Sequence, residues 1–208
     1  MILIGQYDSP FVRRVGIALT LYDLRFEHRP WSWGRDADKL RAHNPLMRVP
    51  TLVLDDGHVL IESHSMLDYL DSLVPAGRRM VPAAEPARHQ QRKITDLATG
   101  LADKAVSLFY ERRLHREVSE FWVDRCRAQI SGALAALEAD RAGRTGIHWF
   151  GDHIGHADTA VAAALRLLAD AHPGLVDMAA FPALAAHAAR CEALPVFQTI
   201  SQPFAAPA

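Results

Sequence analysis

Cysteine is scarce in this chain, and its scarcity argues against several kinds of chemistry. Only Cys126 and Cys191 occur among 208 residues. The two form neither a metal-binding motif nor a disulfide framework. The chain also lacks a Cys-x-x-Cys pair, which disfavours a thioredoxin-type redox protein.

Long apolar runs and an excess of either charge are missing as well. The apolar runs fall far short of the roughly 18 residues that suggest a membrane span. The opening Met-Ile-Leu-Ile-Gly lacks the basic start and the cleavage site of a signal peptide. A formal charge of −1 gives no sign of a nucleic-acid partner. Half of the residues are hydrophobic, which is typical of a globular protein. Together with the missing apolar runs, signal peptide and basic excess, this composition leads us to expect a cytoplasmic protein with no membrane or nucleic-acid partner.

The beginning of the chain predicts a strand, a helix and a second strand. Residues 2–6 and 25–29 have the pattern of short strands. Between them, apolar residues recur at helical spacing. Ser9 is expected to be the N-cap of this helix, with Pro10 at its first position. Two parallel strands joined by a helix make a right-handed βαβ unit.

The next stretch predicts a short helix at 36–43, then a hairpin, then another helix. Residues 51–54 and 58–61 are two apolar runs, and Asp-Asp-Gly between them supplies the turn. After the hairpin, apolar residues return to helical spacing, and Ser63 is expected to be the N-cap. The predicted order of elements is β-α-β-α-β-β-α.

The rest of the chain is helical in pattern. Proline, glycine and arginine punctuate residues 77–86, which indicates a linker. Helical spacing then recurs over residues 87–116, 117–140, 157–172 and 181–193. We therefore predict an α/β domain at 1–76, the linker at 77–86, and an all-α helical bundle at 87–208.

One stretch combines several groups that suit a small zwitterionic ligand. Arg48-Val49-Pro50 leads into the hairpin, and Glu62-Ser63 leads out of it. A carboxylate, a hydroxyl and helix amides therefore meet at one strand-to-helix junction. Val-Pro followed at this separation by Glu-Ser and by Tyr69-Leu70 resembles the glutathione-binding half of a soluble glutathione S-transferase. The earlier Ser-Pro-Phe-Val-Arg resembles the bacterial type, and the resemblance covers the whole chain.

The resemblance implies a fold, a co-substrate and a set of ligand-binding residues. The fold is a thioredoxin-like N-terminal domain followed by an all-α C-terminal domain, with glutathione as co-substrate and no metal. It implies a cis bond before Pro50 and pairing of the Val49 backbone with the cysteinyl main chain of glutathione. Glu62 and Ser63 would hold the γ-glutamyl group. Arg48, near the glycyl carboxylate, and Phe11 complete the expected glutathione-binding set.

Ser9 is the predicted catalytic residue. As an N-cap it places its hydroxyl beside the positive end of a helix dipole. A thiolate bound there gains from the dipole and from a hydroxyl hydrogen bond, so the pKa of the thiol falls. The resemblance implies this use of a serine. Tyr7 is the alternative, since other classes of the family place a catalytic tyrosine at the end of the first strand. A plain N-cap is the purely structural interpretation of Ser9.

The apolar co-substrate is expected to lie against the first long helix of the helical half. The candidate contacts are Trp33, Leu108, Tyr110 and Arg112. An amphipathic helix always offers such residues, so core or dimer packing is the competing interpretation for each of them.

Histidines and aspartates crowd into residues 148–158 and invite a metal interpretation. The resemblance implies a different role, because the family has an N-capping box before its central helix. Asp158 matches the later position of that box, and Gly155 replaces the usual serine or threonine. We expect Asp158 to stabilise the start of the helix.

These observations together predict a homodimeric glutathione S-transferase. The enzyme would activate glutathione as a thiolate for attack on a hydrophobic electrophile, as in detoxification. Two other interpretations stay open: a glutathione-dependent isomerase or dehalogenase/lyase, and a non-catalytic transferase-like ligand-binding protein. The sequence does not name the electrophile.

Overall fold

The computed structural model describes residues 1–206, which form two compact units. Met1–Val81 and residues 194–206 make up the first unit, and Pro82–Ala193 makes up the second. Within the described residues, no helix has both the length and the apolar character needed to cross a membrane.

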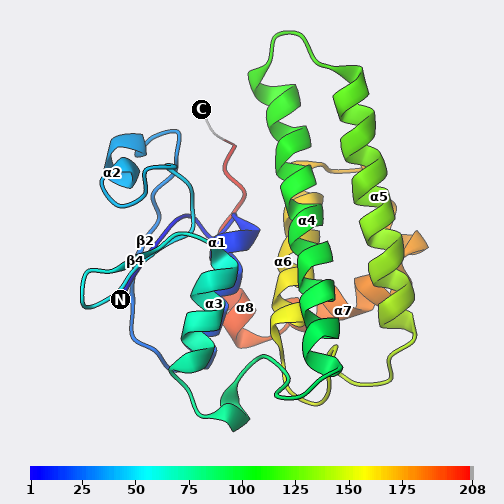
Figure 1. Ribbon diagram of the computed structural model, residues 1–208. Coiled ribbons are helices and arrows are strands. Elements are labelled where there is room, and N and C mark those ends of the chain that lie inside the picture. The colour runs from blue at the N-terminus through cyan, green and yellow to red at the C-terminus, as the bar shows by residue number, and fades with distance from the viewer. Residues whose placement is uncertain (207–208) are drawn as a thin grey trace. The chain divides into compact units, whose positions relative to one another are not determined.

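The first unit is built on a small mixed sheet (Figure 1). Its strands lie in the order β2-β1-β3-β4; β1 and β2 are parallel, and the other pairs are antiparallel. The strands are β1 (Ile2–Ile4), β2 (Glu27–Arg29), β3 (Thr51–Val53) and β4 (Val59–Leu60). All four are shorter than the sequence pattern suggested, but their order and the βαβ unit are confirmed.

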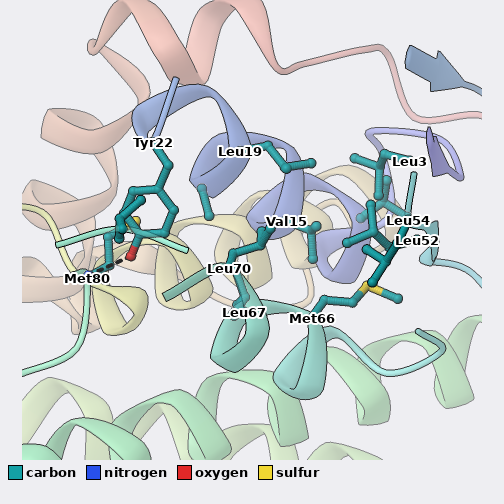
Figure 2. Close-up of a cluster of buried hydrophobic side chains, with 13 residues drawn as sticks. Leu3, Val15, Leu19, Tyr22, Leu52, Leu54, Met66, Leu67, Leu70 and Met80 are labelled. Carbon is teal, nitrogen blue, oxygen red and sulfur yellow. Dashed lines mark hydrogen bonds between the residues drawn. The ribbon is translucent and has the colours of Figure 1, made fainter. Parts of the chain in front are cut away.

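The first unit also contains helices. They are α1 (Pro10–Leu21), α2 (Ala37–Arg41), α3 (Ser63–Ser72), the 3-10 turn η1 (Ala76–Arg78) and α8 (Pro195–Thr199). The apolar faces of α1 and α3 meet over β1 and β3, where Leu3, Val15, Leu52, Met66 and Leu70 form the centre of the core (Figure 2). Each fully buried side chain of this size contributes about 1.5–3 kcal/mol to stability.

A polar network closes one end of this core. The Tyr22 hydroxyl donates to the Asp71 carboxylate. It also accepts from the Met80 backbone N–H at 2.7 Å (Figure 2). Burial and the bond to Asp71 raise the pKa of the phenol, so it stays protonated. Because both contacts reach residues beyond α1, Tyr22 fastens the end of that helix to α3 and to the segment after α3.

The short helix α8 was not predicted, and it belongs to the first unit. The buried Arg13 side chain donates to the carbonyl oxygens of Ile200 and Phe197, each at 2.9 Å. Its guanidinium also lies over the Phe197 ring, 5.4 Å from the centroid. The sequence assigned residues 87–208 to one helical domain, whereas these contacts group residues 194–206 with the first unit.

The second unit is helical. Its elements are α4 (Ala87–Leu114), α5 (Glu120–Ala142), α6 (His156–Ala171), the 3-10 turn η2 (Met178–Ala180) and α7 (Pro182–Glu192). The long helix α4 packs on both α5 and α6, and α6 in turn packs on α7. Twelve of the 16 residues of α6 are buried, as its Ala- and Leu-rich sequence predicts for a central helix. A small mixed-sheet domain followed by a helical domain confirms the predicted fold class.

Candidate functional site

Three segments that the sequence singled out converge at one end of the sheet. Ser9 follows the end of β1, Val49–Pro50 precedes β3, and Glu62–Ser63 follows β4. In the antiparallel pairs, Ile4 lies opposite Thr51, and Leu52 lies opposite Leu60. The end of β1, the start of β3 and the end of β4 are therefore neighbours, although Ser9 and Ser63 are 54 positions apart in sequence.

Ser9 begins helix α1. Its backbone is extended, with φ −72° and ψ 122°, and its Oγ accepts from the Val12 N–H at 3.5 Å. Pro10 occupies the first helical position, where the missing N–H costs no hydrogen bond. A hydroxyl that accepts one hydrogen bond still has its own proton to donate. Ser9 can thus donate to an anion at the positive end of α1.

Gly5 lets α1 and the Val49 loop approach each other. Its φ of +133° is unfavourable for any other residue. A Cβ placed there would lie 2.5 Å from Val12 Cγ2 and 2.8 Å from Val49 Cβ. The first turn of α1 and Val49 therefore lie on either side of Gly5, which brings Val49 close to the Ser9 end of the helix.

The Val49–Pro50 peptide bond is cis, and Asn44 braces the loop that contains it. The Asn44 side chain is fully buried, and its Nδ2 donates to Arg48 O at 3.1 Å and to Thr51 Oγ1 at 3.0 Å. The Thr51 hydroxyl donates to the same Arg48 carbonyl at 3.0 Å. These bonds fix the backbone on both sides of Pro50. Sequence reasoning assigned no role to Asn44, although Asn followed by Pro is a turn signal.

Glu62 and Ser63 form the start of α3. Glu62 is the N-cap, with φ −125° and ψ 133°, and Ser63 is the first helical residue, so the prediction of Ser63 as the N-cap is wrong by one position. The Glu62 side chain makes no capping hydrogen bond. Ser63 is buried, and Arg48 Nη1 lies 3.4 Å from Glu62 Oε1 in a half-exposed ion pair. The first amides of α3 thus receive no bond from the N-cap side chain, and a helix N-terminus of this kind suits an acceptor such as a carboxylate.

Tyr7 lies in different surroundings from Ser9. Its ring stacks on His28 with 3.9 Å between centroids, and a Cβ on Gly16 would lie 2.9 Å from its Cε1. Gly16 is seven residues beyond Ser9, which is about 10 Å along a helix. Burial raises the pKa of the Tyr7 phenol to about 12. The phenol ring thus packs against the middle of α1 rather than against its first turn.

Contacts from the end of the chain also reach this site. Gln202 Oε1 accepts from the Tyr7 N–H at 2.9 Å, and Asp8 Oδ2 accepts from the Ala205 N–H at 3.0 Å. Burial raises the pKa of Asp8, although its hydrogen bond from the Ala205 backbone opposes the shift. No local pattern could have identified Gln202, because the contact spans 195 positions.

The remaining predicted ligand contacts are distributed over both units. Phe11 is half-buried in the first turn of α1, and Trp33, 38% exposed, lies in the loop before α2. Leu108, Tyr110 and Arg112 belong to α4 in the second unit. Leu108 is fully buried, Tyr110 is half-buried and Arg112 is exposed.

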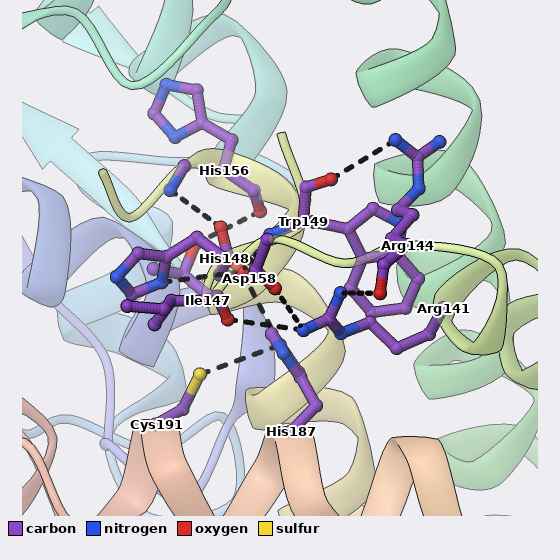
Figure 3. Close-up of polar contacts among 12 residues, drawn as sticks. Arg141, Arg144, Ile147, His148, Trp149, His156, Asp158, His187 and Cys191 are labelled. Carbon is purple, nitrogen blue, oxygen red and sulfur yellow. Dashed lines mark hydrogen bonds and ion pairs between the residues drawn. The ribbon is translucent and has the colours of Figure 1, made fainter. Parts of the chain in front are cut away.

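Asp158 holds together a buried polar cluster at the start of α6 (Figure 3). Its Oδ2 accepts from the Gly155 N–H at 2.8 Å, and its Oδ1 accepts from the Trp149 N–H at 2.9 Å. The bond from the Gly155 N–H is one half of a capping box. The other half, a bond to the side chain of the N-cap residue, is missing because Gly155 has no side chain. His148 and His187 approach Oδ1 from either side, each with a ring nitrogen at 3.7 Å.

The chemistry of this cluster is that of a structural network. Among residues 1–206, no three His, Cys, Asp or Glu side chains are arranged to hold a metal ion. Burial lowers the pKa of His187 to about 4 and raises the pKa of the Cys191 thiol to about 12. Both groups are therefore neutral near pH 7, and a protonated, buried thiol is a poor nucleophile.

Comparison with known proteins identifies the family from both units. Residues 3–79 match the model of the glutathione S-transferase N-terminal domain, and residues 120–190 match that of the C-terminal domain. The uncharacterised GST-like protein YibF of Escherichia coli K12 is 33% identical over 143 residues, covering 66% of this chain and 68% of that protein. A probable maleylacetoacetate isomerase of Drosophila melanogaster is 26% identical over 166 residues, covering 76% and 69%.

A solved structure matches almost the entire chain. It is a glutathione S-transferase from Methylobacterium radiotolerans in complex with glutathione sulfonate. The TM-score is 0.90 at 30% sequence identity, and the match covers 99% of this chain and 95% of the other. Both domain models, a relative of similar length and this structure agree, and the chain belongs to the glutathione S-transferase family.

Proposed function

We propose that this protein is a glutathione transferase whose first unit binds glutathione at the converging ends of β1, β3 and β4. The observation that carries the proposal is the placement of the Ser9 hydroxyl, the braced Val49–Pro50 loop and the uncapped start of α3 at one end of the sheet. The complex of a solved relative with glutathione sulfonate supports the same ligand here.

Each part of glutathione has a partner in this arrangement. The Val49 backbone pairs with the cysteinyl main chain, and the Asn44 bonds keep that backbone in place. Glu62 and Ser63, with the first amides of α3, hold the charged γ-glutamyl end. Arg48 lies beside Glu62 and can reach a carboxylate, and Phe11 adds an apolar contact in the first turn of α1.

Ser9 is the group that activates the thiol. Its hydroxyl donates a hydrogen bond to the sulfur, and the dipole of α1 adds a favourable field, so the thiolate is the form that the site prefers. The proton of the thiol passes to solvent. A carbon–sulfur bond then forms to an electrophilic carbon, whose leaving group departs with the bonding electron pair.

The electrophile and the assembly belong to the same proposal. Trp33, Leu108, Tyr110 and Arg112 are the candidate contacts for a hydrophobic electrophile, and its removal by conjugation would serve detoxification in the cytoplasm. A homodimer follows the expectation for the family. We also propose that residues 77–86 are the linker between the α/β half and the helical half of the chain.

Isomerisation is the second candidate reaction. The similarity to a probable maleylacetoacetate isomerase favours it, since that relative covers three quarters of this chain. The first unit would act alike in both reactions, because each needs a bound thiolate. A dehalogenase or lyase would bind glutathione in the same way and differ only in the later steps. A non-catalytic transferase-like ligand-binding protein has no need of a glutathione site, and a failure to bind glutathione would favour it.

Calorimetric titration with reduced glutathione at two pH values tests the proposal. We expect saturable binding with release of a proton near neutral pH, because a site that lowers the thiol pKa must expel the proton. Binding without proton release would contradict the activation by Ser9. An absence of binding at millimolar glutathione would contradict the whole proposal.

A further inference from the structure

The position of Ser9 depends on the turn that precedes it. Residues 6–9 form this turn, which the Ser9 N–H closes by donating to Gln6 O at 3.1 Å. The bond from the Val12 N–H to Ser9 Oγ is 3.5 Å long, beyond the usual range of about 2.7–3.2 Å. Because this capping bond is long, it holds the hydroxyl weakly, and contacts between the turn and other segments also determine where the hydroxyl lies.

The last segment of the described chain reaches this turn. Residues 197–205, which we call the tail strap, begin in α8, and α8 packs on α1. The buried Arg13 side chain of α1 bonds to two carbonyls at the start of the strap. The later residues Gln202 and Ala205 contact the two residues that precede Ser9. The strap thus extends from α1 back to the turn in front of that helix.

Gly16 allows both the tail strap and the Tyr7 ring to approach α1 closely. A Cβ at Gly16 would lie 2.9 Å from Ile200 Cγ2 and 2.9 Å from Tyr7 Cε1. The Tyr7 ring also stacks on His28 of β2, whose Nε2 lies 2.8 Å from the Gly5 carbonyl oxygen. The Tyr7 side chain is therefore fixed by α1 and β2, and its backbone is the part that the strap holds.

The bond from the Tyr7 N–H to Gln202 Oε1 is the main contact of the tail strap with the turn. This bond is 2.9 Å long and partly buried, whereas the 3.0 Å bond from the Ala205 N–H to Asp8 Oδ2 is exposed. A backbone N–H that is shielded from water loses more when its acceptor is removed. Pro203 follows Gln202 and restricts its backbone to extended conformations, which reduces the entropy lost on ordering this residue.

The tail strap is attached to α1 without the help of Gln202. Its two bonds from the Arg13 guanidinium are buried and charge-assisted, and such bonds are about twice as strong as neutral ones. The bond to the Tyr7 N–H therefore adds little to the attachment of α8. Its main effect is to fix the turn that carries Ser9 relative to the strap.

We propose that Gln202 is a positioning residue for Ser9. Its bond to the Tyr7 N–H keeps the turn at residues 6–9 in one place at the start of α1, and the Ser9 hydroxyl is thereby directed to the sulfur of bound glutathione. Gln202 acts through the Tyr7 backbone and needs no contact with the sulfur. This inference rests on the proposed function, since the position of Ser9 matters only if its hydroxyl activates the thiol.

Ultraviolet titration of the thiolate of bound glutathione tests this role. Gln202→Leu keeps the size of the side chain and Gln202→Ala adds no bulk, and both remove the acceptor. We expect the pKa of the bound thiol to rise by about one in each, because a displaced hydroxyl donates a weaker hydrogen bond. The calorimetric affinity for glutathione should stay within about twofold. Gln129→Leu, the same change at an exposed position of α5, should leave that pKa unchanged.

A second comparison separates positioning from a general loss of structure. In the Ser9→Ala background the hydroxyl is absent, so Gln202→Leu should no longer raise the pKa of the bound thiol. A rise of the same size with and without Ser9 would overturn the proposal. An unchanged pKa in both Gln202→Leu and Gln202→Ala would do the same.

The wild-type protein distinguishes a failure of this inference from a failure of the proposed function. If it binds no glutathione, or binds it with a thiol pKa near the ordinary value of about 8.5, the proposed function fails and this inference fails with it. If the wild-type thiol pKa is lowered and neither Gln202 variant changes it, only the role of Gln202 is wrong.

Discussion

At the scale of single residues, Ser9 and Tyr7 are distinguished by their surroundings. The Ser9 hydroxyl lies at the first turn of α1, whereas the Tyr7 ring packs near Gly16 and its phenol has a pKa of about 12. Both groups can donate a hydrogen bond. Only Ser9 lies at the positive end of the helix, where a donated hydrogen bond would act together with the helix dipole on a thiolate.

We therefore expect Ser9→Ala to lower kcat roughly 100-fold while changing the affinity for glutathione little. The pKa of the bound thiol should rise, which the ultraviolet absorbance of the thiolate measures across a pH titration. Ser9→Thr keeps a hydroxyl and should restore most of the activity, and Tyr7→Phe should be nearly neutral. A large loss in Tyr7→Phe, with none in Ser9→Ala, would assign catalysis to Tyr7.

Asn44 allows a second prediction at this scale. Asn44→Ala leaves the buried carbonyl of Arg48 and the hydroxyl of Thr51 without this donor. The free energy of unfolding should fall by about 2–3 kcal/mol, and glutathione should bind more weakly because the Val49 backbone loses its support. Urea denaturation and calorimetry measure the two effects. Leu46→Ala, at an exposed position of the same loop, should change stability by no more than about 0.5 kcal/mol.

At the scale of elements, the start of α6 depends on a single carboxylate. Asp158 is 1% exposed and accepts from two backbone N–H groups, those of Trp149 and Gly155. Because Gly155 has no side chain, the N-cap residue itself cannot take over this function. The carboxylate also joins the preceding loop to the helix.

Asp158→Ala should accordingly lower the free energy of unfolding by about 3 kcal/mol or more. Denaturant unfolding followed by circular dichroism measures the loss. Asp152→Ala removes an exposed carboxylate from the same loop and should be nearly silent. If the two variants were equally stable, the cluster in Figure 3 would not be essential for the start of α6.

The same scale shows how far the elements could be predicted from the sequence. The order of strands and helices followed from local periodicity and turn residues, because α1, α4, α5 and α6 are long enough to show it. The helix α8 has only five residues and belongs to the first unit through contacts with Arg13, so no local pattern revealed it. The predicted start of α3 was one residue too late. Serine is a typical N-cap residue, but here the N-cap is Glu62, whose side chain makes no capping hydrogen bond.

The predicted site residues show the same limit. Ser9, Val49 and Glu62 carried recognisable local patterns. Asn44 and Gln202 matter through hydrogen bonds to other segments, and for Gln202 the contact crosses almost the whole chain. Pairing of that kind depends on the folded structure and leaves no periodic trace in the sequence.

At the scale of the whole molecule, stability should depend on pH through His187. The unfolded chain protonates this residue near its ordinary pKa of 6.5, whereas burial in the folded protein lowers the pKa to about 4. Between these values the unfolded state binds more protons than the folded state. The contribution to stability is therefore complete above pH 6.5 and is lost as the pH falls toward 4.

Urea denaturation at pH 7 and at pH 5 measures this dependence. The wild-type midpoint should be lower at pH 5, and His172, whose pKa is also lowered by burial, should add to the loss. In His187→Gln the difference between the two pH values should shrink, because the substituted side chain does not titrate. A pH dependence that is identical in wild type and variant would exclude His187 as its source.

The division of the first unit has a consequence for biosynthesis. Its sheet and core come from residues 1–81, but the carbonyls of Phe197 and Ile200 that bond to the buried Arg13 arrive with the last segment of the described chain. A ribosome releases the chain from its N-terminus, so the helical unit has been translated before those carbonyls are available. The first unit is thus begun before the helical unit and completed after it, and a product truncated after the helical unit would lack the carbonyls that bond to Arg13 of α1.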